Sequence, residues 1–401
     1  MFKKIFCLML VTLLMLACLV ACQNDSEVPA DSEPATDSGE PSDTTDPNNG
    51  DDDQPGNSSK TLELNSSTTA VRLLGGRMIA TDTYITCDQA GSGIEFSLVN
   101  TGKTITFSVE TSAPCKFVAY VNGAPAVSIE GNELFTVNGK GMITISNLDS
   151  GEITVRLIKL NGADTATAQL NSIVYVGEMS TTAPDGAQGY IEFVGGSLPS
   201  DNVMLSDAFA IAKAKNAEYS ILSELSLLCG ETDLSAAYLL QSSKRGTAAY
   251  DFAKKAKTVV VDLGAADYAL SKTDNSVTSE VFAEKYEALL EAIISSNGTE
   301  DAPCRVICVY DMANGAFARA VNDVCANLGG QSAGIYTCQK ISGDDGLMSS
   351  DEQEEYLTRL ASVIELAEAG TITEERMSSA ESGDGMKVSY KDFVKVSVDT
   401  Q

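Results

Sequence analysis

The hydrophobic pattern of this chain changes its period near residue 187, and this change constrains the fold more than any other feature. Before it, short runs alternate between apolar and polar residues, as strands with one buried face do. About nine such runs fall within 61–178, and no long helical pattern interrupts them. One of them, 115–121, ends on the hairpin dipeptide Asn122-Gly123. This number and spacing of strands predicts an all-β sandwich of the jelly-roll kind.

After this point, strand-like and helix-like segments alternate along the chain. The predicted strands are 190–194, 218–225, 258–263, 304–310 and 333–340. The predicted helices are 203–217, 246–257, 278–296, 315–328 and 351–368. Such alternation predicts a three-layer α/β domain over 187–370, in which helices cover both faces of a parallel sheet. The C-terminal extension, 371–401, is acidic and then alternating, which fits either an edge hairpin or a loose tail.

The first 21 residues have the features of a lipoprotein signal peptide. Lys3 and Lys4 precede an apolar run at 5–20 that is short for a membrane span. The run closes on Ala21-Cys22, the pattern at which bacterial lipoproteins are cleaved and the new N-terminal cysteine receives a lipid. Cys18 is a poorer second candidate because the bulky Leu16 precedes it, and an uncleaved anchor is the alternative. We therefore expect a membrane partner through lipid on Cys22, and a place on the bacterial cell surface or envelope.

The segment 22–60 predicts a disordered acidic linker. Residues 23–60 hold 11 Asp or Glu and almost no apolar side chains, so they cannot bury enough surface to offset the entropy of ordering. The whole chain carries a net charge of -29. A surface this negative repels phosphates, which excludes nucleic acid as a partner.

Cysteine and histidine usage bears on the chemistry available to the chain. Seven cysteines lie beyond Cys22, in no spacing typical of a zinc site. Cys304 and Cys308 share one face of a predicted strand, where they would act as small buried hydrophobic residues. The chain contains no histidine at all. We therefore expect neither a metal nor any other cofactor.

Two glycine-containing segments end predicted strands, where ligand sites form in open α/β sheets. They are Ile191-Glu192-Phe193-Val194-Gly195-Gly196-Ser197 and Leu263-Gly264-Ala265-Ala266-Asp267-Tyr268. With Gly76-Arg77, Gly91-Ser92-Gly93-Ile94-Glu95-Phe96, Val121-Asn122-Gly123 and Val155-Arg156-Leu157-Ile158-Lys159 of the β domain, they make the chain resemble carbohydrate esterase family two. The resemblance covers about 68–368. It implies a jelly-roll sandwich followed by an SGNH-hydrolase-like, flavodoxin-like domain, with polysaccharide deacetylation as the family activity.

The departures from the family pattern concern its reacting groups. The resemblance implies that Ser197 is the nucleophile equivalent, preceded by Gly196 where the family has Asp. It implies that Glu224 lies in the block that supplies an oxyanion-hole glycine, and that Ala266 replaces the oxyanion-hole Asn. Asp267 is retained, and Met348 lies near the place of the catalytic histidine. Because a serine needs a base to attack at neutral pH, these losses together predict an inactive site.

Each of these residues also has a purely structural interpretation. Ser197 can cap the helix that follows, and Asp267 can accept hydrogen bonds from loop amides. Met348 fits a packing residue, and Glu224 fits a solvated charge at a strand end or a new pocket group.

Three functions remain open at this point. The sequence favours a non-catalytic surface lipoprotein that binds carbohydrate or a partner. The alternatives are an active esterase that uses Ser197 with an atypical base, and a protein-interaction module of an envelope complex. No lysine lies close in sequence to the two glycine-containing strand ends, which argues against a serine–lysine pair there.

Overall fold

The computed structural model describes residues 58–187, 189–229, 233–241, 248–299, 302–340 and 348–370, all within one compact unit, 54–401. The predicted signal peptide, Cys22, nearly all of the linker and the extension 371–401 lie outside the described residues. None of the helices in the described part of the chain is both long and apolar enough to cross a membrane.

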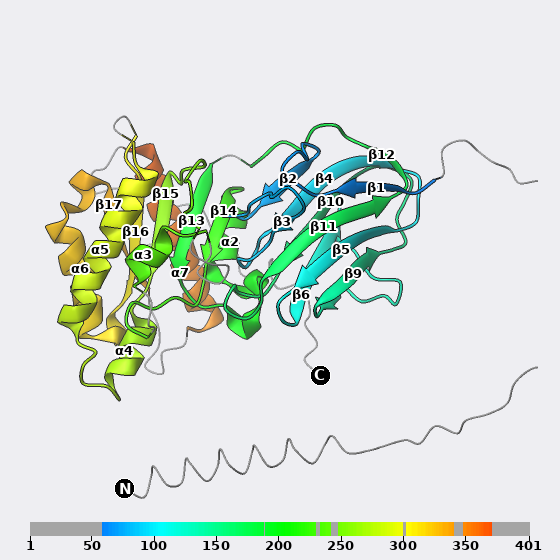
Figure 1. Cartoon of the computed structure of the whole chain (residues 1–401). Coiled ribbons are helices and arrows are strands. Elements are labelled where there is room, and N and C mark those ends of the chain that lie inside the picture. The colour runs from blue at the N-terminus through cyan, green and yellow to red at the C-terminus, as the bar shows by residue number, and fades with distance from the viewer. Residues whose placement is uncertain are drawn as a thin grey trace, which may run out of the picture. The chain divides into compact units, whose positions relative to one another are not determined.

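The N-terminal part consists of two antiparallel sheets (Figure 1). One contains β1 (Lys60–Glu63), β11 (Ala168–Tyr175), β5 (Ile105–Thr111) and β9 (Lys140–Ile145), and β3 (Ile85–Thr86) pairs with β11. The other contains β12 (Gly177–Met179), β4 (Gly93–Asn100), β10 (Gly151–Lys159), β6 (Cys115–Val121) and β7 (Ala124–Pro125), with β2 (Val71–Leu74) on β4 and β8 (Leu134–Val137) on β6. Alternating side chains such as Phe96, Phe107 and Phe117 meet in one core between the sheets.

The C-terminal part is a parallel five-stranded sheet with the order β14-β13-β15-β16-β17. Its strands are β13 (Tyr190–Gly195), β14 (Glu218–Leu222), β15 (Thr258–Asp262), β16 (Arg305–Asp311) and β17 (Ile335–Lys340). In terms of these five strands, the order is 2-1-3-4-5, which is the flavodoxin-like order. The predicted parallel sheet is therefore present.

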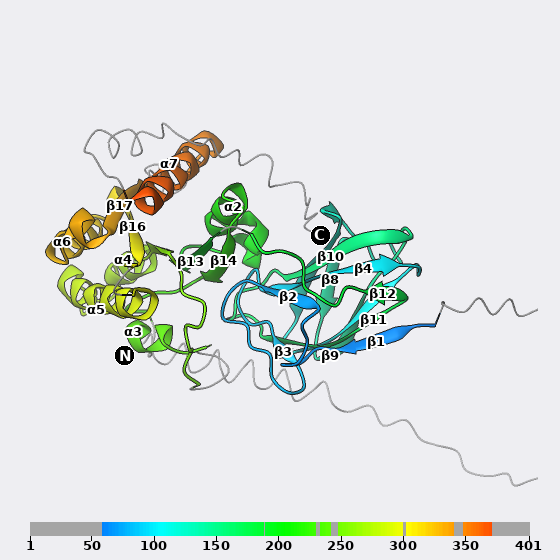
Figure 2. The ribbon, with the colours of Figure 1, turned by 90° about the horizontal axis from the view of Figure 1, so that it is seen from above.

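Helices cover both faces of this sheet (Figure 2). One face packs against α2 (Asp207–Ala214) and α7 (Ser350–Ala369). The other packs against α3 (Leu234–Tyr238), α5 (Ser279–Asn297) and α6 (Ala316–Asn327). The remaining helical segments are α4 (Ala265–Ser271) and the 3-10 turns η1 (Pro199–Asp201), η2 (Val203–Leu205), η3 (Met312–Asn314) and η4 (Gly330–Ala333).

Two helix predictions differ from the structure. The predicted helix 203–217 is broken because Ser206 caps α2, accepting a hydrogen bond of 3.2 Å from the Phe209 amide. The predicted helix 246–257 is wrong over its described residues, 248–257, which form no helix. Tyr250 and Phe252 stack there against the Arg77 guanidinium, at 4.9 and 5.4 Å, and Phe252 has a left-handed φ of 50°. That contact with the sandwich overrides the local helical pattern.

The sandwich and the α/β sheet share a continuous hydrophobic core. Leu74, Ile158 and Leu160 of the sandwich belong to the same cluster as Ile191 and Ile221 of the parallel sheet. A buried ion pair joins Arg77 of the sandwich to Glu192 of β13, with 3.0 Å between Nε and Oε1. These contacts fix the two parts together and position the loops that follow β13 and β14.

Candidate functional site

Ser197 follows the carboxyl end of β13, at the edge of the sheet where ligand sites are expected. Gly195 makes the turn, with a left-handed φ of 89°, and a Cβ on it would lie 2.2 Å from the Asp262 carbonyl oxygen. Only glycine fits this position. The turn leaves Ser197 exposed. Ser197 caps none of the helices that follow, since their N-cap residues are Leu198, Asn202 and Ser206, so the capping interpretation is wrong.

Glu224 follows the end of β14 and contacts the residues on both sides of Ser197. Its amide donates a hydrogen bond of 3.1 Å to the Gly196 carbonyl oxygen, and its carboxylate accepts one from the Leu198 amide. Glu224 adopts a left-handed φ of 56° to do this. A carboxylate therefore accepts a hydrogen bond from the amide that follows Ser197. The sequence had left open a solvated charge or a pocket group, and the structure places Glu224 against the serine turn.

Asp267 is fully buried, in the first turn of α4. It accepts hydrogen bonds from the Ser226 hydroxyl at 2.6 Å and from the Leu228 amide at 2.7 Å. Its carboxylate thus holds the loop after β14. The neighbouring Ala266 is exposed, whereas Met348 is half-buried just before α7 and packs against the hydrophobic core.

Three charged residues that the sequence interpretation had not placed here meet next to the Ser197 turn. Lys340 at the end of β17 points its Nζ between Asp262 at 3.3 Å and Asp207 at 3.4 Å. The Asp262 carboxylate lies 3.6 Å from where a Cβ on Gly196 would be, beside the position at which the family pattern has Asp. A lysine is therefore close to this strand end in space. Its signal in the sequence was its position at the last residue of a predicted strand.

The electrostatics of this cluster keep Lys340 charged. Burial by itself would lower the pKa of Lys340, but the charges of Asp262 and Asp207 outweigh burial and raise the pKa above its ordinary value. A lysine with a raised pKa stays protonated at neutral pH and cannot accept the Ser197 proton. Gln353 completes the arrangement by donating a hydrogen bond of 2.7 Å to Asp207.

The space between Ser197 and these carboxylates is small. A cavity of about 20 Å³ is lined by Ser197, Asp207, Asp262 and Tyr356 among others. A volume of this size holds little more than one water molecule. Within the described residues, no three His, Cys, Asp or Glu side chains come together in a way that could hold a metal ion.

Comparison with known proteins was informative only at the level of structure. No sequence-family profile matches the chain, and no curated protein sequence does. A family two carbohydrate esterase from Clostridium thermocellum, solved with cellohexaose, superposes with a TM-score of 0.62 at 19% identity, over 75% of this chain and 100% of that one.

Two further structures agree with this result. A family two carbohydrate esterase from Cellvibrio japonicus gives a TM-score of 0.64 at 14% identity, over 78% of this chain and 99% of that one. An acetyl xylan esterase from the rumen bacterium Butyrivibrio proteoclasticus gives 0.62 at 15% identity, over 78% and 100%. The resemblance predicted from the sequence is confirmed at this level: the chain has the multidomain fold of the family two carbohydrate esterases.

Proposed function

We propose that this protein is a catalytically silent relative of the carbohydrate esterases that binds carbohydrate at the bacterial cell surface. The observation that carries the proposal is the surroundings of Ser197. Glu224 occupies the adjacent Leu198 amide, Lys340 is held as a cation between Asp207 and Asp262, and the sequence has no histidine. A serine without a base, next to carboxylates that oppose an oxyanion, lacks both main sources of esterase catalysis.

An esterase assay tests this proposal. The chain from residue 23 onward should not hydrolyse p-nitrophenyl acetate or acetylated xylan, and Ser197 should not react with a fluorophosphonate probe that labels an active esterase in parallel. Hydrolysis that disappears in Ser197→Ala would establish the alternative, an active esterase with an atypical base. Labelling of the wild type but not of Ser197→Ala would lead to the same conclusion.

The lipid anchor, the domain limits and the jelly-roll topology belong to the same proposal. The mature chain begins at the lipid-bearing Cys22, and 22–60 separates the membrane from a jelly-roll sandwich at 61–178 and an SGNH-like domain at 187–370. The signal pattern before Cys22 and the acidic composition of the linker support this arrangement. Cys22→Ala should move the protein from the membrane fraction to the soluble fraction and abolish palmitate labelling. Continued labelling of this variant would point to Cys18 instead.

A further inference from the structure

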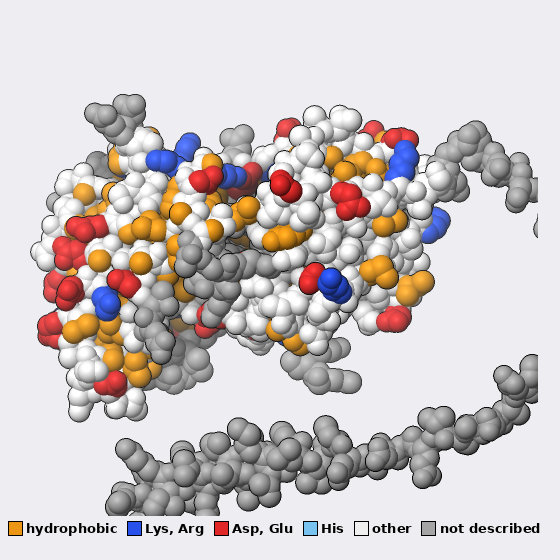
Figure 3. Space-filling view, in the orientation of Figure 1, with side chains coloured by type: hydrophobic (Ala, Val, Ile, Leu, Met, Phe, Trp, Pro, Cys, Tyr) orange, Lys and Arg blue, Asp and Glu red, His pale blue; other side chains and the backbone are white. Residues whose placement is uncertain are grey.

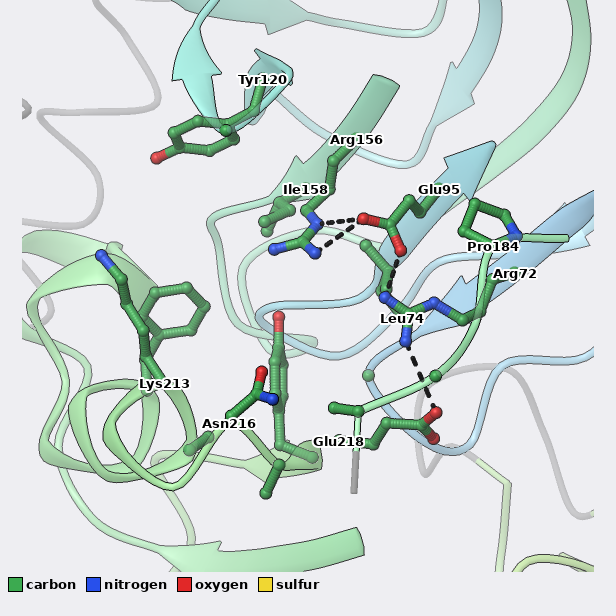
Figure 4. A pocket seen from close by; sticks show the side chains of 18 of the residues that line it. Arg72, Leu74, Glu95, Tyr120, Arg156, Ile158, Pro184, Lys213, Asn216 and Glu218 are labelled. Atoms are coloured by element: carbon green, nitrogen blue, oxygen red, sulfur yellow. Dashed lines mark hydrogen bonds and ion pairs between the residues drawn. The ribbon is translucent and has the colours of Figure 1, made fainter. Parts of the chain in front are cut away.

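A second and much larger cavity lies where the sandwich meets the α/β sheet (Figure 4). Its volume of about 510 Å³ falls in the range of pockets that bind small molecules, and such pockets often form between domains. Strands β2, β4, β6 and β10 of the sandwich form one wall. The end of α2 and the start of β14 form the other.

This cavity is separate from the Ser197 turn. Glu218 and Tyr219, which line it, begin β14, whereas Ser197 follows the carboxyl end of the parallel strand β13. Parallel strands have their carboxyl ends at one edge of the sheet, so the cavity and Ser197 lie at opposite edges. The five residues of β14 span roughly 16 Å. A ligand bound in the cavity therefore does not contact Ser197 or the charged residues around it.

A row of side chains crosses four neighbouring strands on the cavity wall. Strand registers place Arg72 opposite Glu95, Glu95 opposite Arg156, and Arg156 opposite Tyr120, all on one face of the sheet. The buried Glu95 carboxylate accepts hydrogen bonds from both guanidinium groups, at 2.7 Å from Arg156 Nη2. Figure 4 shows Tyr120 and Arg156 facing the same hollow as Lys213.

Arg72 lies enclosed in this wall between the carboxylates of Glu95 and Glu218. Its Nη1 is 3.6 Å from Glu218 Oε1, and within the described residues neither Nη1 nor Nε makes a hydrogen bond. Because both nitrogens are buried, a ligand in the cavity does not reach them, and Arg72 serves to hold Glu95 and Glu218 in the wall. The Arg156 side chain is half exposed. Its Nε and Nη2 donate hydrogen bonds to Glu95, and the rest of its guanidinium group lines the cavity.

Aromatic rings supply part of the apolar surface of the cavity, next to aliphatic side chains such as Leu74 and Ile158. Tyr120, Phe209 and Tyr219 all line it. Tyr219 is fixed by a hydrogen bond of 3.0 Å from its hydroxyl to the Gly91 carbonyl oxygen and by an edge-on contact with Phe209. Rigid rings next to paired charges suit a ligand with apolar C–H faces and a rim of hydroxyls, which describes a sugar ring.

The charges of the lining argue for a neutral sugar. Three basic residues (Arg72, Arg156, Lys213) and three acidic residues (Glu95, Asp185, Glu218) line the cavity, so their formal charges cancel. The chain as a whole carries -29, which repels a polyuronic acid. On the face shown in Figure 3, acidic side chains are spread over both parts of the molecule. This negative charge does not weaken the binding of a neutral hydroxylated ligand.

The cavity has room for a chain rather than a single sugar. At Thr154 it meets a second groove, of about 500 Å³, that continues along the same sheet over β4, β10 and β12. Polar and apolar residues both line this groove, and among the polar ones the Thr154 and Ser97 hydroxyl oxygens are 3.0 Å apart. We propose that the interdomain cavity binds the end of a neutral oligosaccharide whose following residues lie along this groove.

Single-tryptophan reporters test the proposal, because the natural chain contains no tryptophan. Tyr120→Trp places the reporter in the cavity, Ser197→Trp at the opposite edge of the sheet, and Tyr84→Trp in a sandwich turn away from both. Each variant of the chain from residue 23 onward is titrated with cellohexaose, xylohexaose and hexagalacturonic acid while tryptophan emission and iodide quenching are followed.

We expect a saturable change in Tyr120→Trp with at least one neutral hexasaccharide, and no change in the two other reporters. Adding Arg156→Gln to the Tyr120→Trp variant should weaken binding about tenfold, and circular dichroism checks that the fold is intact. Three outcomes would overturn the proposal: no response to either neutral ligand, a response at Ser197→Trp instead, or a response to the acidic ligand alone. This inference rests on the proposed carbohydrate binding, whereas the esterase assay tests only catalytic silence. A response at Ser197→Trp alone would keep carbohydrate binding and remove the cavity as its site, so the two failures are distinguishable.

Discussion

At the scale of single residues, Asp267, which matches the family pattern, has a structural role. It is buried, and its carboxylate accepts hydrogen bonds from Ser226 at 2.6 Å and from the amides of Leu227 at 3.4 Å and Leu228 at 2.7 Å. Asp267→Ala leaves these donors without an acceptor and should lower the free energy of unfolding by about 3 kcal/mol. Asp267→Asn, which keeps one acceptor oxygen, should lose less. Urea unfolding measures both, and equal losses would contradict this role.

Lys340 gives a prediction about pH. Its pKa in the folded protein is raised above the ordinary value of 10.5, so the ammonium stabilises the fold at every pH below 10.5. This stabilisation is lost as the pH rises from there through the higher folded-state value. Compared with the wild type, Lys340→Met should therefore lose about 2 kcal/mol of stability, with a constant difference between roughly pH 6 and 9 and a smaller one only above pH 10.5.

The control for Lys340 is Lys140→Met, which removes an exposed ion pair of 3.7 Å with Glu110 and should change little. Urea unfolding at a series of pH values measures both variants. A difference between wild type and Lys340→Met that already falls between about pH 6 and 9 would mean that Lys340 deprotonates near neutrality. In that case it could act as a base for Ser197.

At the scale of secondary structure elements, a capping box determines where α7 begins. Ser349 accepts a hydrogen bond of 3.3 Å from the Glu352 amide, and the Glu352 carboxylate accepts one of 2.7 Å from the Ser349 amide. This capping box begins the longest helix on its face of the sheet. Ser349→Ala should cost about 1 kcal/mol in thermal unfolding, and the neighbouring exposed Ser350→Ala much less. Equal effects of the two variants would show that the cap does not stabilise α7.

At the scale of the whole molecule, the buried contact of Arg77 joins the two domains. Arg77 pairs with Glu192 and donates hydrogen bonds to the carbonyl oxygens of Tyr238 at 2.6 Å and Leu240 at 2.8 Å. Arg77→Met leaves the Glu192 carboxylate buried without its cation and should cost about 3–5 kcal/mol. Calorimetry should then show the two domains unfolding in separate transitions. A single unshifted transition would mean that the apolar interface suffices.

The sequence by itself determined the order and type of most elements, because the apolar periods of 2 and 3.6 are local properties. The predicted strand 304–310 and the predicted helices 278–296 and 351–368 agree closely with β16, α5 and α7, and Ser197 follows a strand end as predicted. The same local reasoning failed at 248–257, where Tyr250 and Phe252 pack on an arginine more than 170 positions earlier in the chain.

Only the tertiary structure decided which charges face Ser197. Lys340, Asp207 and Asp262 are far apart in sequence and meet because parallel strands and α2 bring their ends to one edge of the sheet. The tertiary structure also forms the interdomain cavity. Its walls come from strands and a helix that are far apart in the sequence, so no local pattern predicts it. The absence of histidine could be read directly from the sequence, whereas the surroundings of the serine depend on long-range packing that a single sequence does not encode in any local signal.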